Sequence, residues 1–240
     1  MNAIRVILTL LFILLISGTS NYINAQDSTV KVLDIDNIKA LTTDPNSEYY
    51  YPTLVRDYMS NDTTLLSLND FRYLYFGAAF QEDYNPYRST LVENNPVQQL
   101  YYQDKHTAAE CDSIIKYAEL SLADNPMNLK QITFYIIALR ERGKYARADL
   151  WEYRLRNLIT AILSSGYGTE DSPWWIIYPV HEYNILNFMN YLATKHTDMG
   201  EDKDYLEITK QKRSDPDGFY FNTSLIKEMY QLKYNQKLIQ

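Results

Sequence analysis

The chain has 240 residues, and 23 Lys and Arg against 30 Asp and Glu give it a formal net charge of −7. This acidic balance, without a local cluster of basic residues, disfavours nucleic-acid binding because phosphate groups are repelled. Cys111 is the single cysteine, so an intrachain disulfide is excluded and the fold must rest on a packed core.

The chain begins like a secretory signal peptide. Arg5 is the only charged residue before Asp27, and an apolar run follows it over residues 6–16. That run is shorter than the about 20 residues that a membrane-spanning helix needs, and small residues precede Ala25. We therefore expect residues 1–25 to be removed, with a cut after Ser20 or an uncleaved amphiphilic anchor as alternatives.

The expected mature chain is soluble, exported to the periplasm or the cell exterior, and without a transmembrane segment. No cysteine stands directly after the apolar run, so a lipoprotein anchor is not expected.

The region 26–166 is predicted to be helical, because apolar residues recur there at intervals of three and four. Helices are predicted to begin near positions 32, 53, 67, 107, 128 and 145. Ser67 and Thr107 are each followed three residues later by an acidic residue, which is the spacing of a capping box. Gly166 is predicted to end the last helix in a left-handed conformation.

The stretch Phe71–Tyr87 is rich in aromatic residues, which suit either a core or a binding surface. Its first part predicts a helix that is apolar nearly all round, and such a helix is buried. Most of these aromatic residues are therefore predicted to belong to the core. Tyr84 and Tyr87 follow in a polar segment and remain candidates for a surface.

The region 167–240 is predicted to be a small α+β unit. The stretch "PWWIIYP" is short, aromatic and β-branched, which predicts a strand, and a helix with His196 in its tail follows. Alternating apolar residues around a Ser-Asp-Pro-Asp-Gly turn predict a β-hairpin over residues 204–222. A last helix is predicted from about Ser224. The fold class is therefore α+β and mainly α, with a small antiparallel sheet.

The stretch "LADNPMNLKQITFYIIALRERGKYARA" resembles the tetratricopeptide pattern. Gly143, Tyr145 and Ala148 match the turn between the two helices of such a repeat. Ile136 departs from the pattern where small residues are usual, and Glu152 departs where an aromatic residue is usual. The resemblance therefore implies a degenerate helix pair rather than a regular array, which needs about three repeats.

Several stretches together resemble a family of secreted Bacteroidetes proteins that is classed as a domain of unknown function. They are "YYYPTLVRDYMSNDTTLLSLNDFRYLYFGAAFQEDYNPY", "SGYGTEDSPWWIIYPVHEYNIL" and "GFYFNTS". The resemblance implies a signal peptide, a fold of helices and a sheet, and a Gram-negative cell. It implies no activity, substrate or catalytic residue.

The sequence contains no motif for catalysis, a metal or a cofactor, so we assign none of the three and favour a protein that is not an enzyme. "HEYNI" from His181 begins like a zinc-protease motif but has Ile185 in place of the second histidine. No nucleophile elbow, phosphate-binding loop or dinucleotide fingerprint is present. His106 and His196 are expected to be exposed and without a special role.

Cys111 lies on the apolar stripe of a predicted helix, near its start. A small buried hydrophobic residue is the main interpretation. A nucleophile is the alternative, because a helix N-terminus can lower a thiol pKa.

Consecutive tyrosines cannot all face one core, and tyrosine suits interfaces because it is large, fairly rigid and polar at its tip. The candidate ligand or partner surface comprises Tyr49, Tyr50, Tyr51, Tyr84, Tyr87, Tyr101, Tyr102, Trp174 and Trp175. The expected function is an exported, non-catalytic protein that binds an envelope protein or peptide through a helical, tyrosine-rich surface.

Two alternatives remain open. The first is binding of a glycan or small ligand at Trp174 and Trp175, beside Glu170 and Asp171. The second is a hydrolase without a recognisable motif, which predicts a buried carboxylate or histidine with a shifted pKa.

Overall fold

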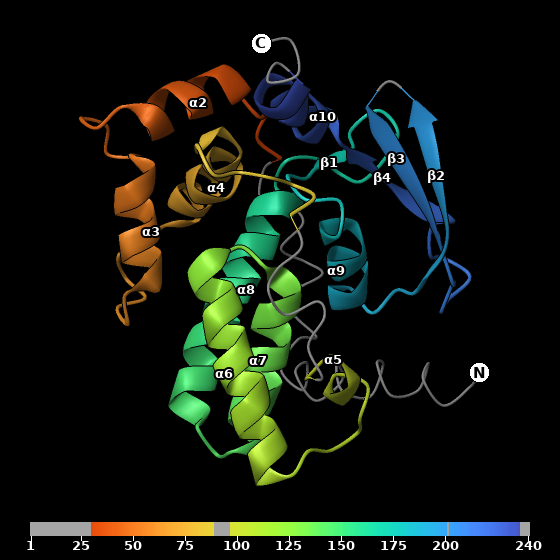
Figure 1. The fold of residues 1–240 in the computed structure, drawn as a ribbon. Coiled ribbons are helices and arrows are strands. Elements are labelled where there is room, and N and C mark those ends of the chain that lie inside the picture. The colour runs from red at the N-terminus through yellow and green to blue at the C-terminus, as the bar shows by residue number, and fades with distance from the viewer. Residues whose placement is uncertain (1–29, 89–96, 201, 236–240) are drawn as a thin grey trace. The chain divides into compact units, whose positions relative to one another are not determined.

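A computed structural model describes residues 30–88, 97–200 and 202–235, and its fold is α+β and mainly α (Figure 1). The chain forms two compact units. Unit 1 contains Arg88–Arg156, and unit 2 contains Ser28–Tyr87 together with Asn157–Gln240. Unit 2 therefore joins the sheet-containing C-terminal part to a segment from the predicted N-terminal helical region. The predicted signal peptide lies outside the described residues.

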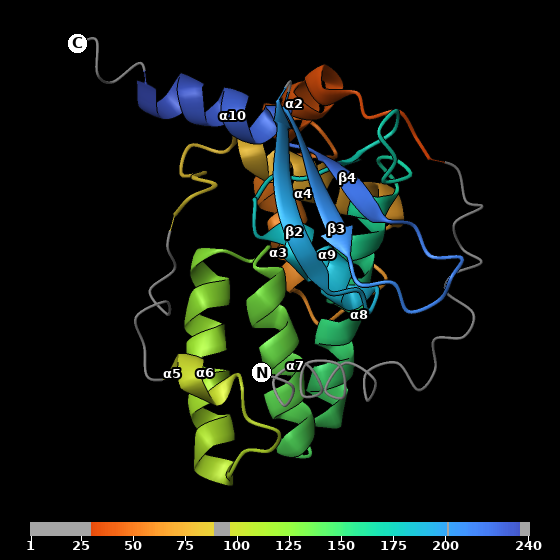
Figure 2. The same ribbon diagram turned by 90° about the vertical axis from the view of Figure 1, so that its right-hand side faces the viewer.

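Unit 1 is helical. Its helices are α5 (Val97–Leu100), α6 (Ala108–Asp124), α7 (Leu129–Glu141) and the first part of α8 (Tyr145–Leu163). α6 and α7 lie side by side (Figures 1 and 2). The packed faces consist of apolar residues at helical spacing, among them Ile114, Ala118, Leu122, Ile132, Tyr135 and Leu139. The predicted apolar stripes of both helices are therefore confirmed.

The capping box at the start of α6 is confirmed. Thr107 Oγ1 accepts a hydrogen bond from the backbone N–H of Glu110 at 3.3 Å, and Glu110 Oε2 accepts one from the N–H of Thr107 at 2.7 Å. The two side chains thus satisfy N–H groups that a helix start leaves without partners. α4 in unit 2 (Leu68–Gly77) begins with the same arrangement, formed by Ser67 and Asp70.

The turn between α7 and α8 has some features of the tetratricopeptide pattern. Gly143 has a φ of 69° and Ala148 is buried. Tyr145, however, is 62% exposed, whereas the pattern places this ring between helices. The resemblance to a repeat therefore stays a prediction.

Unit 2 combines helices with a four-stranded sheet (Figure 1). Its N-terminal elements are α2 (Ile35–Thr43), α3 (Tyr51–Met59), α4 and the 3₁₀ turn η2 (Ala78–Phe80). Its C-terminal elements are β1 (Trp174–Trp175), α9 (His181–Phe188), β2 (Ala193–Gly200), β3 (Lys203–Ile208), β4 (Gly218–Asn222), α10 (Ser224–Tyr230) and the π-helical turn η3 (Gln231–Asn235).

The strand order is β1-β4-β3-β2. The hairpin of β3 and β4 is confirmed, with Leu206 opposite Phe219. The expectation of a purely antiparallel sheet is wrong at one edge, because β1 pairs with β4 in parallel. β2 was not predicted: α9 ends at Phe188, Asn190 adopts a φ of 64°, and the chain containing His196 pairs with β3 instead of continuing the helix.

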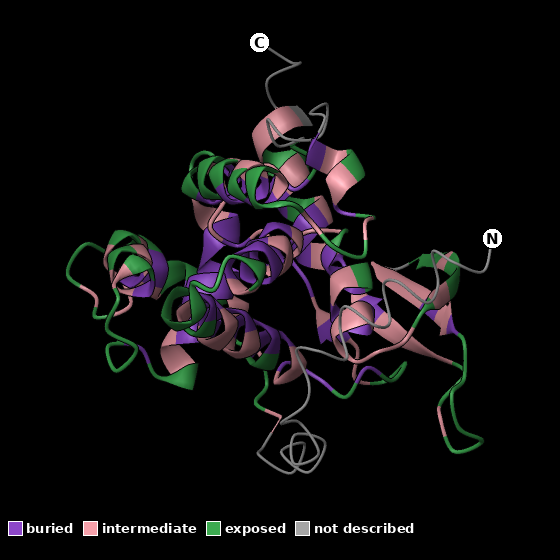
Figure 3. Cartoon of the chain, turned by 90° about the horizontal axis from the view of Figure 1, so that it is seen from below, coloured by how far each residue is buried: buried purple, intermediate pink, exposed green. Residues whose placement is uncertain are grey.

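Most aromatic residues of α4 belong to the core of unit 2, as predicted. Phe71, Leu74, Tyr75 and Phe76 are all buried. Most helices have one buried and one exposed face (Figure 3), whereas α4 buries residues on several sides. The helix is therefore enclosed rather than laid on the surface.

The predicted role of Gly166 is wrong, since the positive φ belongs to Gly168, at 70°. Gly166 is required for close approach instead. A Cβ atom there would lie 2.3 Å from the carbonyl oxygen of Pro173.

Candidate functional site

Three of the predicted surface residues lie in the interior. Tyr84, Tyr101 and Trp174 are buried, and each donates a hydrogen bond to a protein acceptor. The acceptors are the carbonyl of Ile177, the Gln131 side chain and the carbonyl of Gly166 respectively. These rings therefore serve the core, and Trp174 in particular offers no face to a glycan.

Four of the predicted residues are half-buried: Tyr49, Tyr50, Tyr51 and Trp175. Tyr49 stacks on Tyr73 with ring centroids 3.8 Å apart. Burial raises the pKa of Tyr51 well above its ordinary value. Because only Trp175 of the tryptophan pair is partly accessible, the glycan alternative retains a single indole ring.

The remaining two, Tyr87 and Tyr102, are exposed, by 56% and 54%. Tyr87 belongs to a group that sequence reasoning missed. Its ring meets that of Tyr230 edge-on at 5.0 Å, and Tyr230 lies 4.9 Å from Tyr234. We call Tyr87, Tyr230 and Tyr234 the tyrosine cluster. The spacing of the last two by four residues was the available signal, since such residues share a helix face.

A second group brings titratable side chains together in unit 2. Glu182 stands in the first turn of α9, His196 on β2 and Asp204 on β3. His196 Nε2 lies 3.6 Å from Glu182 Oε2 and 3.3 Å from Asp204 Oδ2. We call these three residues the acid–histidine cluster.

Strand pairing explains why these residues meet. His196 is opposite Leu206, and Asp204 is two residues from Leu206 on the same strand. His196 and Asp204 therefore lie on the same face of the sheet. α9 lies at this sheet in both side views (Figures 1 and 2). Sequence reasoning missed the cluster because it placed His196 in a helix tail.

The acid–histidine cluster has an unusual charge environment. The Glu182 side chain is 2% exposed, and within the described residues its Oε1 has no hydrogen-bond partner. Burial, reinforced by the negative charge of Asp204, raises the pKa of Glu182 to about 9. Two carboxyl groups this close can share a proton or jointly hold a cation.

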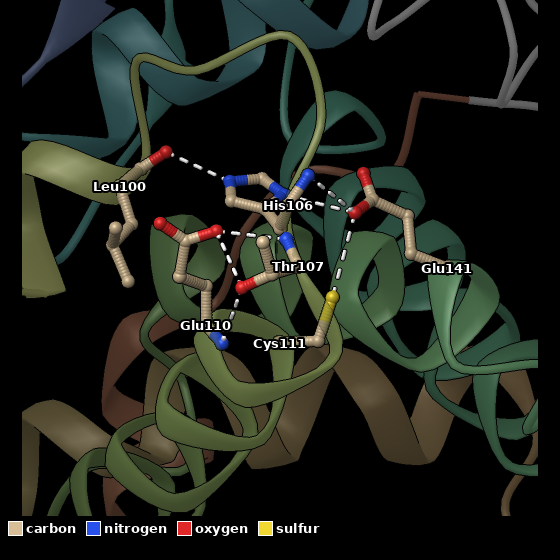
Figure 4. Close-up of polar contacts among 6 residues, drawn as sticks. All are labelled: Leu100, His106, Thr107, Glu110, Cys111 and Glu141. Carbon is tan, nitrogen blue, oxygen red and sulfur yellow. Dashed lines mark hydrogen bonds and ion pairs between the residues drawn. The ribbon is translucent and has the colours of Figure 1, made fainter.

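A third group, in unit 1, surrounds the cysteine (Figure 4). Glu141 Oε2 lies 3.0 Å from His106 Nδ1 and accepts a hydrogen bond from Cys111 Sγ at 3.4 Å. His106 Nε2 lies 2.8 Å from the carbonyl oxygen of Leu100. The expectation that His106 is exposed is wrong, because its side chain is almost fully buried by these contacts.

The environment of Cys111 does not suit a nucleophile. Burial, with the hydrogen bond to Glu141 and its negative charge, raises the pKa of the thiol to about 11. A nucleophilic cysteine needs the opposite shift, toward the thiolate. Cys111 is buried on the apolar face of α6, as the main interpretation of the sequence expected.

Over the described ranges, no helix combines the length and the apolar character needed to cross a bilayer. The fold is that of an α+β protein, mainly α, with a mixed four-stranded sheet in one of its two units. Residues 36–232 match the family DUF4919, described as a domain of unknown function, and the chain belongs to this family. Comparison with curated proteins and with solved structures gives no significant match.

Proposed function

We propose that this protein is an exported, non-catalytic protein that binds a protein or peptide partner of the cell envelope through tyrosine side chains. The observation that carries the proposal is the tyrosine cluster, in which exposed Tyr87 packs against Tyr230 and Tyr234. Tyrosine loses little side-chain entropy on binding and offers both an apolar face and a polar tip.

The arrangement of the cluster favours a prepared contact surface. Tyr234 donates from its hydroxyl group to the carbonyl oxygen of Tyr84 at 3.2 Å, which anchors one member to the core. The ring of Tyr230 lies between those of the other two. The rings are therefore already held in place before a partner binds, so less side-chain conformational entropy is lost on binding.

The surroundings indicate what kind of partner suits the cluster. Glu82 and Asp83 are exposed in the segment that leads to Tyr87. Lys233 is turned inward, with its ammonium group over the ring of Tyr84. A partner segment with an aromatic or apolar anchor and a basic flank would complement this arrangement.

Export rests on the N-terminal sequence, with its short apolar run and small residues before Ala25. N-terminal sequencing of the protein from the envelope fraction of its native cell tests this part. We expect the chain to begin at Gln26. An intact Met1 in material recovered from the cytoplasm would contradict export.

Site-specific photo-crosslinking tests the binding surface. A photoreactive phenylalanine analogue replaces Tyr87 in one sample and Tyr167 in a matched control. Tyr167 is 54% exposed, nearly the same as Tyr87, and has no ring contact with the cluster among the described residues. We expect one envelope protein to crosslink at position 87 and to be competed by unlabelled protein.

Equal crosslinking at both positions would contradict the proposed surface, as would none at position 87 with a probe shown to be reactive. The Tyr87→Ala and Tyr167→Ala variants provide a second measurement. Only the first is expected to release the captured partner, and both should unfold at the same denaturant concentration as the wild type.

A further inference from the structure

We propose that Glu182, His196 and Asp204 bind one divalent transition-metal ion of the Zn²⁺ class. This inference is independent of the partner-binding proposal and concerns a different set of residues. It rests on the distances between the ligand atoms, on the buried Oε1 atom of Glu182 that has no hydrogen-bond partner among the described residues, and on the chemistry of the donor set.

The distances suit a shared ion. His196 Nε2 lies 3.6 Å from Glu182 Oε2 and 3.3 Å from Asp204 Oδ2, and all three ligand atoms lie within 4.8 Å of one another. Ligands at about 2.1 Å from a tetrahedral zinc ion are separated by roughly 3.4 Å. An ion between these atoms therefore needs only small side-chain movements.

Glu182 supplies an observation independent of the clustering. Its side chain is nearly excluded from solvent, and Oε1 finds no hydrogen-bond donor within the described residues. Neither Glu182 nor Asp204 forms an ion pair with a lysine or arginine there. A buried polar oxygen without a hydrogen-bond partner is costly. A bound cation would give the Glu182 carboxyl group a partner and would neutralise the two acidic side chains together.

The donor set selects the kind of ion. One imidazole nitrogen with two carboxylate groups suits Zn²⁺ or a neighbouring transition metal, whereas Mg²⁺ and Ca²⁺ prefer oxygen ligands throughout. The His196 side chain is 40% exposed, so the ion can enter from that side. Three protein ligands also leave a coordination position for water.

The group of His106, Cys111 and Glu141 in unit 1 gives weaker support for a metal site. Glu141 accepts from the Cys111 thiol and lies against His106, whose other ring nitrogen lies against the Leu100 carbonyl oxygen. Each ligand-type side chain therefore already has a partner. Because thiol and imidazole groups do bind zinc, this cluster is the necessary control.

The test is isothermal titration of the full chain, without a histidine tag, with Zn²⁺ and separately with Mg²⁺. The variants are His196→Ala, Glu182→Gln and, as control, Cys111→Ser. We expect one Zn²⁺ per chain in the wild type and in the control. Zinc affinity should fall by at least about tenfold in the other two variants, as is usual even for changes next to a ligand.

Titration with Co²⁺ gives a second readout that does not depend on affinity. Binding at the proposed site produces cobalt d–d absorption without a sulfur-to-cobalt charge-transfer band. Three results would each overturn the proposal: loss of the bound ion in Cys111→Ser, equal zinc binding in His196→Ala and wild type, or absence of Zn²⁺ binding to a folded wild-type chain.

Discussion

Arg72 on α4 donates from Nη1 to the carbonyl oxygen of Ser164, just beyond α8, at 3.1 Å, although 92 residues separate them. Its Nη2 donates to the carbonyl oxygen of Lys31 at 3.1 Å. The guanidinium group is buried, and burial lowers its pKa. One side chain thus joins three segments of unit 2 by satisfying backbone acceptors that no helix or strand satisfies.

Replacement of Arg72 by Met should destabilise the protein by about 3 kcal/mol, because two charge-assisted hydrogen bonds to part-buried carbonyl groups are lost. The Ser164 carbonyl oxygen keeps its hydrogen bond from the N–H of Lys31. Urea denaturation of the variant measures this loss. Arg56→Met is the control, since Arg56 is exposed and its ion pair among the described residues is with its neighbour Asp57. The control should unfold like the wild type, and equal losses in both variants would contradict the role of Arg72.

Gly166→Ala and Gly143→Ala should separate steric from conformational effects. A Cβ at Gly166 would lie 2.3 Å from a backbone oxygen, whereas a Cβ at Gly143 meets nothing within 4 Å but has a φ of 69°. We expect Gly143→Ala to cost about 1 kcal/mol from the left-handed conformation alone. Gly166→Ala should cost more, because the backbone must move. Thermal unfolding of both variants decides the order, and the reverse order would refute this explanation.

Tyr75→Phe should destabilise the core of unit 2. The Tyr75 hydroxyl oxygen accepts from the N–H of Ile177 at 3.2 Å and lies 2.7 Å from His181 Nδ1. Both partners lose this interaction in a buried site, at a cost of about 1–3 kcal/mol. The control is Tyr205→Phe, on the half-exposed side of β3, which should change the free energy of unfolding little. A Tyr75→Phe variant as stable as the wild type would show that the bonds contribute nothing.

The stability of the protein should fall through Cys111 as the pH rises from about 9 to about 11. The folded thiol has a pKa of about 11, whereas an unfolded thiol loses its proton at about pH 8.5. In this window the unfolded chain has released the proton and the folded chain retains it, so rising pH favours unfolding.

Serine does not titrate in this range, so Cys111→Ser should lose less stability than the wild type between pH 9 and 11. Tyrosines titrate in both proteins, and the comparison removes their contribution. Denaturation curves at the two pH values give the difference. Identical pH dependence in both proteins would show that the thiol pKa is not raised.

Local signals made much of the helical structure predictable. The capping boxes at Ser67 and Thr107 depend on residues three apart, so their partners can be read directly from the sequence. The buried aromatic residues of α4 follow in the same way from helical spacing. The hairpin of β3 and β4 was predictable because alternating apolar residues on both sides of a Ser-Asp-Pro-Asp-Gly segment indicate two strands and the connection between them.

The features that sequence reasoning missed depend on contacts between distant residues. "ATKHTDMG" has little strand propensity, and β2 forms because β3 offers it an edge. The acid–histidine cluster depends on that pairing, so it could not be predicted once His196 was assigned to a helix. The burial of Tyr84 and Tyr101 likewise depends on acceptors far away in the chain, at Ile177 and Gln131.

The arrangement of the units has a consequence for synthesis on the ribosome. Unit 2 is built from Ser28–Tyr87 and Asn157–Gln240, and Arg88–Arg156 of unit 1 is made between them. The first segment therefore emerges without the strands, without the Ser164 carbonyl that accepts from Arg72, and without the Ile177 and His181 partners of Tyr75. At about 10 residues per second, synthesis of the intervening residues takes several seconds. During that interval α4 can pack on α2 and α3, which belong to the same first segment, but the side of α4 that the later segment covers lacks its partners and is open to chaperones. α6 and α7 can pair with each other before that later segment is made.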